Sequence, residues 1–168
     1  MFSLNVPLPG AVRQRVESLR PALGGFETVR EVPTLVAKRF GRRSAADWAC
    51  VESEARLALA GAPAFAVRLD GLDAFDPPVS GPGPVVYLTV ESPGLAALHE
   101  RLVEAFGAVA GLEGPDYVPH VTVARGGGPG DLEPLLDTPV EPVEWDVTEL
   151  WFWDARHGER VGRVGLPG

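Results

Sequence analysis

The chain of 168 residues lacks most of the features that mark export, metal binding or membrane insertion. Its single cysteine, Cys50, cannot form an internal disulfide and has no cysteine or histidine at ligand spacing, so no structural zinc is expected. No apolar run approaches the roughly 20 residues that span a bilayer. The first residues also lack the basic and apolar segments of a signal peptide. We therefore expect a cytoplasmic protein with no contact to a membrane.

Basic residues are also fewer than acidic residues. The 15 lysines and arginines face 23 aspartates and glutamates, for a formal net charge of -8. A general nucleic-acid coat needs many cationic contacts to phosphates, which this balance argues against. The basic residues cluster once, at Lys38, Arg39, Arg42 and Arg43. A local phosphate site remains open there, although a solvated basic edge is the simpler interpretation.

An internal repeat is the strongest positive signal. FSLNVPLPG (2–10) aligns with VYLTVESPG (86–94), and each predicts a strand followed by a helix with proline at its start. Ser92 is a natural N-cap of the second helix. Apolar residues then recur at helical spacing in both copies, at Val12, Val16, Leu19 and Leu23 and at Leu95, Leu98, Leu102 and Phe106.

A second pair of similar segments follows these helices. VPTLVAKRFG (32–41) lies 86 residues before VPHVTVARGG (118–127), close to the 84-residue offset of the first pair. Each copy therefore reads as a strand-helix-strand unit, near 2–41 and 86–127. We predict an α+β protein, a single bilobal domain over 1–168. Two lobes related by a pseudo-twofold axis, each a mainly antiparallel sheet with outer helices, would surround a central cleft.

The remaining segments connect and close these units. Ser44 with Asp47 predicts the start of a helix of about sixteen residues, and a strand follows at 64–72. Residues 73–84, rich in proline and glycine, are expected to be an irregular connection between the lobes. A short helix is predicted near 131–136. The segments 143–156 and 158–167 read as a closing hairpin that turns near His157.

The second copy of the motif carries the candidate chemistry. In an extended strand His120 and Thr122 share one face about 7 Å apart, where they can contact two oxygens of one phosphate. An imidazole with an ordinary pKa near 6.5 can exchange a proton at neutral pH. A lone His-x-Thr strand is a weak signal, because a buried histidine is often only hydrogen-bonded in place. Its position in the repeat strengthens the functional interpretation.

The whole chain resembles the 2H phosphoesterases, in particular the bacterial 2'-5' RNA ligase-like 2',3'-cyclic phosphodiesterases. The likeness is carried by PHVTVAR (119–125), by the opening FSLNVPLPGAVRQRV and by the ending WFWDARHGERVGRVGLP. The resemblance implies one His-x-Thr strand per lobe facing the cleft. It also implies action on a 2',3'-cyclic phosphate or related phosphodiester of RNA or a nucleotide. Neither a cofactor nor a metal is expected, and we expect a monomer.

The first copy departs from the family pattern. Aligned on the shared Val-Pro, Thr34 takes the histidine position and Val36 the threonine position, while Arg39 matches Arg125. In an alternative register Thr34 would be the retained threonine. Neither register supplies a histidine, so the two-histidine mechanism that the resemblance implies is excluded.

Three interpretations remain open: a weak or altered phosphodiesterase, a nucleotide- or RNA-end-binding protein without turnover, and a partner-binding scaffold. By strand parity Lys38 shares the face of Thr34 and Val36, so it is the expected substitute for the missing histidine. His157, in the predicted turn, is a second candidate. The other candidate contacts are Arg125, which should point away unless its strand bulges, and Tyr117, which could line the cleft or pack between strands. His99 is expected to be a solvated helix position.

Overall fold

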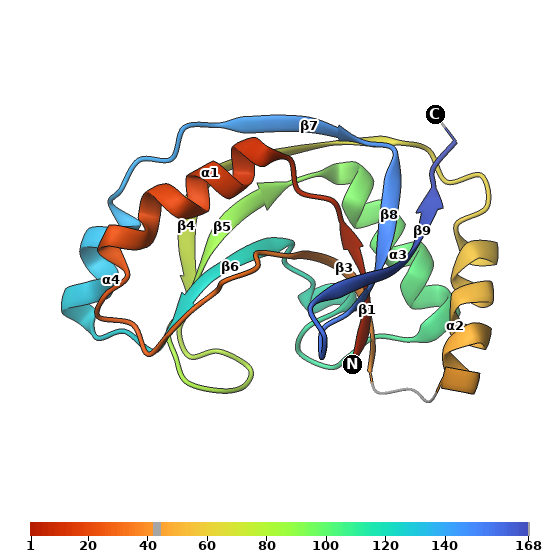
Figure 1. Cartoon of the computed structure of the whole chain (residues 1–168), viewed down its shortest axis with the longest axis horizontal. Helices are drawn as coiled ribbons and strands as arrows, with labels where there is room; N and C mark the ends of the chain where they lie inside the picture. The colour runs from red at the N-terminus through yellow and green to blue at the C-terminus, as the bar shows by residue number, and fades with distance from the viewer. Residues whose placement is uncertain (42–44, 168) are drawn as a thin grey trace.

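The computed structural model describes residues 1–41 and 45–167, apart from the side chains of residues 45 and 46. Within this part of the chain, helices and strands combine into a curled antiparallel sheet with helices packed against it (Figure 1), which confirms the α+β prediction. The helices are α1 (Gly10–Leu19), α2 (Ala45–Ala58), α3 (Pro93–Phe106) and α4 (Pro129–Leu136). The strands are β1 (Phe2–Val6), β2 (Thr28–Val29), β3 (Leu35–Gly41), β4 (Phe65–Phe75), β5 (Val85–Glu91), β6 (His120–Arg125), β7 (Val143–Val147), β8 (Glu149–Asp154) and β9 (Glu159–Gly165).

The predicted helical stripes are buried, but α1 ends at Leu19, so Leu23 is buried beyond the end of this helix. Seven of their eight apolar residues are buried in one core cluster, and Phe106 is half-buried against it. The predicted cap is present, because the hydroxyl of Ser92 accepts the backbone N–H of Leu95 at 3.1 Å. The predicted helix start at Ser44 lies outside the described residues, as do Arg42 and Arg43.

The two motif strands lie together in the middle of the sheet. The strand order is β7-β4-β5-β6-β3-β1-β8-β9, with β2 beside β6. β3 and β6 are antiparallel, and Leu35 is paired with Val121. Helix α3 packs against β3 and β4, and α2 packs on α3. Both motif strands are therefore anchored from the core side through Leu35 and Val121, whose side chains are fully buried.

Two connections differ from the sequence prediction. Residues 73–75 belong to β4 instead of an irregular segment, and residues 76–84 join β4 to its direct neighbour β5. The segment 143–156 is also divided, because β7 pairs with β4 whereas β8 pairs with β1 and β9. The final turn at residues 155–158 is found where it was predicted. The division into two lobes stays a prediction.

No helix among the described residues is long and apolar enough to cross a membrane.

Candidate functional site

A cleft of about 1110 Å³ lies over the two motif strands. Its wall includes side chains from both copies of the motif: Thr34 and Val36 from the first copy, and His120 and Thr122 from the second. The wall also includes residues of β1, of β8 and of the turn before β9, together with residues of the segments 28–32, 76–84 and 111–118. The central pairing of β3 with β6 explains this convergence, since it sets the two copies side by side.

His120 is held in a defined orientation at the start of β6. Its Nδ1 lies 2.6 Å from the carbonyl oxygen of Val118, which can only accept a hydrogen bond, so Nδ1 carries the proton and Nε2 keeps the lone pair. The ring packs edge-on against Phe75 and Tyr87, with centroids 5.1 and 5.2 Å apart. Burial lowers the pKa of His120, and nearby arginine charges lower it further. The imidazole is therefore neutral at neutral pH and suited to accept a proton.

Lys38 does not line the cleft, and the predicted placement is wrong. Leu4 of β1 is opposite Lys38 and Asn5 is opposite Val36, so Ala37 is an extra residue in β3. A bulge of this kind reverses the alternation of side chains. Lys38 consequently turns into the core, where its side chain is 2% exposed and its Nζ lies 2.5 Å from Oε2 of Glu113.

The same bulge turns Arg39 into the cleft. The carboxylate of Glu113 fixes this part of β3, because its Oε1 accepts the backbone N–H of Arg39 at 2.7 Å while Oε2 binds Lys38. The guanidinium of Arg39 is 3.9 Å from the same carboxylate. Arg39, aligned with Arg125 in the repeat, is thus the cationic side chain that the first motif strand supplies.

Arg125 reaches the cleft through a second bulge. Val86 of β5 is opposite Ala124 and Tyr87 is opposite Thr122, so Val123 is the extra residue in β6. Arg125 therefore lines the cleft, and its guanidinium donates to the carbonyl of Ser80 at 2.9 Å. The two bulged residues, Ala37 and Val123, occupy equivalent positions of the repeat, 86 residues apart.

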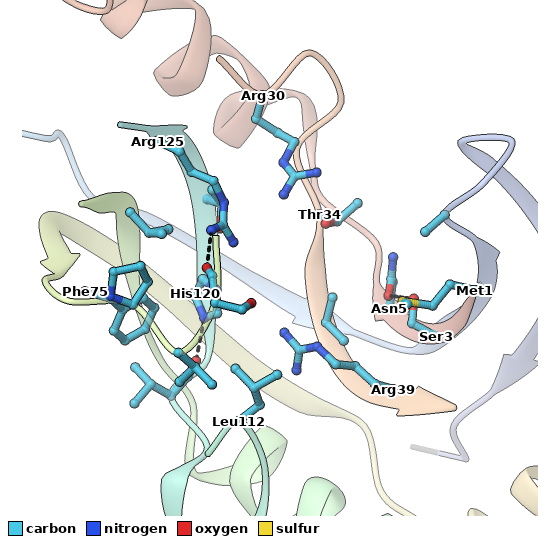
Figure 2. Close-up of a pocket in the computed structure, with 18 of the residues that line it drawn as sticks. Met1, Ser3, Asn5, Arg30, Thr34, Arg39, Phe75, Leu112, His120 and Arg125 are labelled. Carbon is cyan, nitrogen blue, oxygen red and sulfur yellow. Dashed lines mark hydrogen bonds between the residues drawn. The ribbon is translucent and has the colours of Figure 1, made fainter. Parts of the chain in front are cut away.

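Arg30 is a cleft residue that the sequence reasoning missed. It follows the two-residue strand β2, and its backbone N–H donates to Val123 at 2.8 Å. Figure 2 shows Arg30, Arg39 and Arg125 directed toward the space in front of His120. Burial, and next the charge of Arg125, lowers the pKa of Arg30. No sequence signal marked this residue, because Arg30 belongs to neither the aligned motif nor a periodic element.

Tyr117 and His99 support the motif strand from behind. Tyr117 does not line the cleft; its hydroxyl donates to the carbonyl of Val36 at 2.8 Å and its ring stacks on His99 at 3.7 Å. His99 is 1% exposed, so the expected solvated position is wrong. Its Nδ1 donates to the carbonyl of Ala37 at 2.7 Å and its Nε2 accepts the N–H of Gly114 at 3.0 Å.

His157, the second candidate substitute, does not line the cleft. It lies in the final turn with 58% of its side chain exposed, and its Nδ1 is 2.6 Å from Oδ2 of Asp154. This contact is the main reason that the pKa of Asp154 is lowered. Of the described histidines only His120 lines the cleft. Across the same described chain, no three His, Cys, Asp or Glu side chains are grouped to hold a metal ion.

A family model described as the 2'-5' RNA ligase superfamily matches residues 8–159. The chain belongs to this superfamily, the 2H phosphoesterases. The second copy of the repeat carries His120 and Thr122, and the first copy has Thr34 and Val36 at the aligned positions. The curated proteins include no significant match.

Solved structures with this fold are similar over nearly the whole chain. TT0787 of Thermus thermophilus is 23% identical with a TM-score of 0.70, and the match covers 99% of this chain and 98% of that one. E. coli LigT, solved in complex with 3'-AMP, is 20% identical with a TM-score of 0.68 and the same coverage. A structure described as a phosphoesterase is 20% identical with a TM-score of 0.65, again with 99% and 98% coverage. At these identities the likeness establishes the fold.

Proposed function

We propose that this 2H phosphoesterase-like protein binds the phosphate of a nucleotide or RNA end in the cleft and slowly cleaves 2',3'-cyclic phosphates with His120 as its single proton-transfer group. The observation that carries the proposal is the convergence of His120, Thr122 and three arginines on one cleft. Structures of E. coli LigT, which shares the fold, have been solved with 3'-AMP, ATP and NADP+. Those ligands support a phosphate-bearing nucleotide as the ligand class.

The chemistry follows from the groups in the wall. The lone pair of neutral His120 can take a proton from the water that attacks phosphorus. The hydroxyls of Thr122 and Thr34 can donate to phosphoryl oxygens, and the guanidinium groups stabilise the charge that develops there. The departing ribose oxygen takes its proton from water in this mechanism, because an arginine remains protonated at every ordinary pH and Val36 has no proton to give. We therefore expect turnover about 10²- to 10⁴-fold slower than with two histidines.

Binding without turnover is the second candidate. It is favoured by the burial of Lys38 against Glu113, which removes the expected substitute for the second histidine from the cleft. The remaining cationic groups, Arg30, Arg39 and Arg125, bind anions without exchanging protons. A protein of this kind would hold a phosphorylated end and leave it intact.

Hydrolysis of an oligonucleotide that ends in a 2',3'-cyclic phosphate tests the proposal. Wild type is compared with His120→Ala and with His157→Ala, whose side chain lies outside the cleft wall. Turnover that is lost only in His120→Ala supports a one-histidine phosphodiesterase. If no variant turns over but the oligonucleotide binds, and Thr122→Val weakens binding, the second candidate stands. Absence of both turnover and binding contradicts the proposal.

A further inference from the structure

Asn5 of β1 has a side-chain amide that the proposed mechanism does not use. The residue lines the cleft and is only 3% exposed. The hydroxyl of Ser3 donates to Oδ1 of Asn5 at 2.8 Å, which fixes the orientation of the amide. Within the described chain, Nδ2 of Asn5 has no hydrogen-bond partner and still contacts solvent. Its N–H groups are therefore open to the cleft, where a ligand can accept them.

Asn5 belongs to the row of cleft residues that contains His120. It is paired with Val36 where β1 and β3 run side by side. Leu35 and Val121 are paired in the antiparallel ladder of β3 with β6. The residues next to them, Val36 and His120, are therefore opposite one another. The row thus crosses three neighbouring strands, and all three of its side chains line the cleft. Figure 2 shows Asn5 and His120 on opposite sides of the first motif strand, β3.

Val36 is the position at which the first copy of the motif lacks a hydrogen-bond donor. The aligned residue of the second copy is Thr122, whose hydroxyl can donate to a phosphate. A phosphoryl oxygen over Val36 meets only methyl groups, and an unpaired oxygen is destabilised where water is excluded. The amide of Asn5, on the neighbouring strand, can donate to this oxygen. In the second copy, Thr89 takes the position of Asn5 and lies outside the cleft wall, with its hydroxyl 3.4 Å from Asp70. Among the described residues, the donor at this position is therefore specific to the copy that lacks the threonine.

We infer that Nδ2 of Asn5 donates to an oxygen of the bound phosphate and supplies the contact that a threonine at position 36 would make. The phosphate then lies over Val36, between His120 and Asn5, and Ser3 is the positioning residue for the amide. A carboxamide neither gains nor loses a proton at ordinary pH, so Asn5 binds the phosphate and His120 remains the single proton-transfer group. This inference rests on the proposed function and adds a residue to the same phosphate site.

Side-chain NMR of the wild-type protein tests this contact directly. The sequence has one asparagine, Asn5, and one glutamine, Gln14, so only these residues give carboxamide NH2 signals. Gln14 is an exposed residue of α1 outside the cleft wall and is the internal control. Titration with inorganic phosphate or with adenosine 3'-phosphate should shift the signals of Asn5 and leave those of Gln14 unchanged. Ligand binding without a shift of the Asn5 signals would overturn the inference.

Dissociation constants of variants, taken from the same titrations, separate a phosphate contact from packing. Asn5→Ala should weaken binding of inorganic phosphate and of adenosine 3'-phosphate by the same factor, about tenfold, because the lost donor contacts the group that both ligands share. Asn5→Asp keeps the shape of the side chain without the N–H donors, so it should weaken both ligands at least as much. Val36→Thr, added to Asn5→Ala, should recover about threefold or more, since its hydroxyl returns a donor to the same oxygen. Gln14→Ala, the matched control, should stay within about twofold of wild type.

A loss of affinity for adenosine 3'-phosphate alone would overturn the inference, because Asn5 would then contact the ribose or the base. So would a double variant that binds no better than Asn5→Ala. If both ligands bind wild type and Thr122→Val weakens them while Asn5→Ala does not, the proposed function survives and this inference fails. If neither ligand binds wild type, both fail. The titration of the wild-type protein decides the inference even if a substitution at this buried position prevents folding.

Discussion

Leu35 of β3 and Val121 of β6 are paired at the centre of the sheet, and they stand 86 residues apart, the offset that separates the two copies of the motif. Thr34 and His120 directly precede these two residues, and both line the cleft. The side chain of Thr34 therefore lines the same cleft as His120. If the first copy has lost a motif histidine, as we propose, a histidine at position 34 should restore it.

Restoring the first motif should raise activity. The double variant Thr34→His with Val36→Thr supplies a second imidazole and a hydroxyl on the wall that faces His120. We expect hydrolysis of a 2',3'-cyclic phosphate to increase about 10²-fold or more, because the departing oxygen gains a proton donor. Steady-state kinetics measures the gain. Adding His120→Ala to the double variant should abolish it, and a folded double variant with wild-type turnover would contradict the prediction.

Breaking the buried ion pair should destabilise the fold. Lys38→Met leaves the carboxylate of Glu113 buried without its ammonium partner, at an expected cost of about 3 to 5 kcal/mol in the free energy of unfolding. The double variant Lys38→Met with Glu113→Gln should recover part of this loss, since no unpaired buried charge remains. Urea denaturation measures both. Arg20→Met, which breaks an exposed pair with Glu17, should cost less than about 1 kcal/mol.

A loss for Lys38→Met as small as that for Arg20→Met would show that the Lys38 side chain reaches solvent, against the burial found here. The double-variant comparison separates charge from packing. If the double variant is no more stable than Lys38→Met alone, packing of the lysine stem causes the loss.

His120 should still act as a base at pH values below the ordinary pKa of a histidine side chain. Burial and then the charge of Arg39 favour the neutral ring, so the acidic limb of the pH-rate profile should lie below pH 6.5. The contribution of His120 to the free energy of unfolding is fully present above the pKa that the ring has in the unfolded chain. It is lost as the pH falls through the lower pKa of the ring in the folded protein. Titration of the ring by NMR measures the shift. Arg39→Met should raise the pKa of His120; an unchanged or lower value would exclude Arg39 as a cause.

The hydroxyl of Tyr117 should contribute to the stability of the fold and should not affect ligand affinity. Tyr117→Phe removes the hydrogen bond to the carbonyl of Val36, which should lower the free energy of unfolding by about 1 kcal/mol. The affinity for adenosine 3'-phosphate should stay within about twofold of wild type, because the hydroxyl does not line the cleft. Chemical denaturation and calorimetry on the same samples check both values. A marked loss of affinity with unchanged stability would place Tyr117 in the site.

Local chemistry along the chain was enough to predict several features. The apolar stripes of α1 and α3 and the Ser92 cap follow from helical periodicity and from the orphan N–H groups at a helix start. The repeat predicted that the two motif strands would lie beside each other or face each other across a cleft, and β3 and β6 are paired. The sequence alone also shows that position 34 is a threonine and not a histidine.

Tertiary structure decided which cations reach the cleft. Strand parity predicted Lys38, but the extra residues at Ala37 and Val123 reverse that parity and present Arg39 and Arg125 instead. A bulge is set by the register of two paired strands, so the alternation within one strand cannot reveal it.

A local sequence pattern also could not predict which polar side chains are buried. Lys38 is paired with Glu113, which lies 75 residues further along the chain, and His99 is bonded to Ala37, 62 residues before it. Arg30 enters the cleft through the two-residue pairing of β2 with β6. Charged and polar groups are buried only where folding supplies a partner. The sequence by itself determined the family, the repeat and the single motif histidine, whereas long-range pairing alone determined the cationic wall around it.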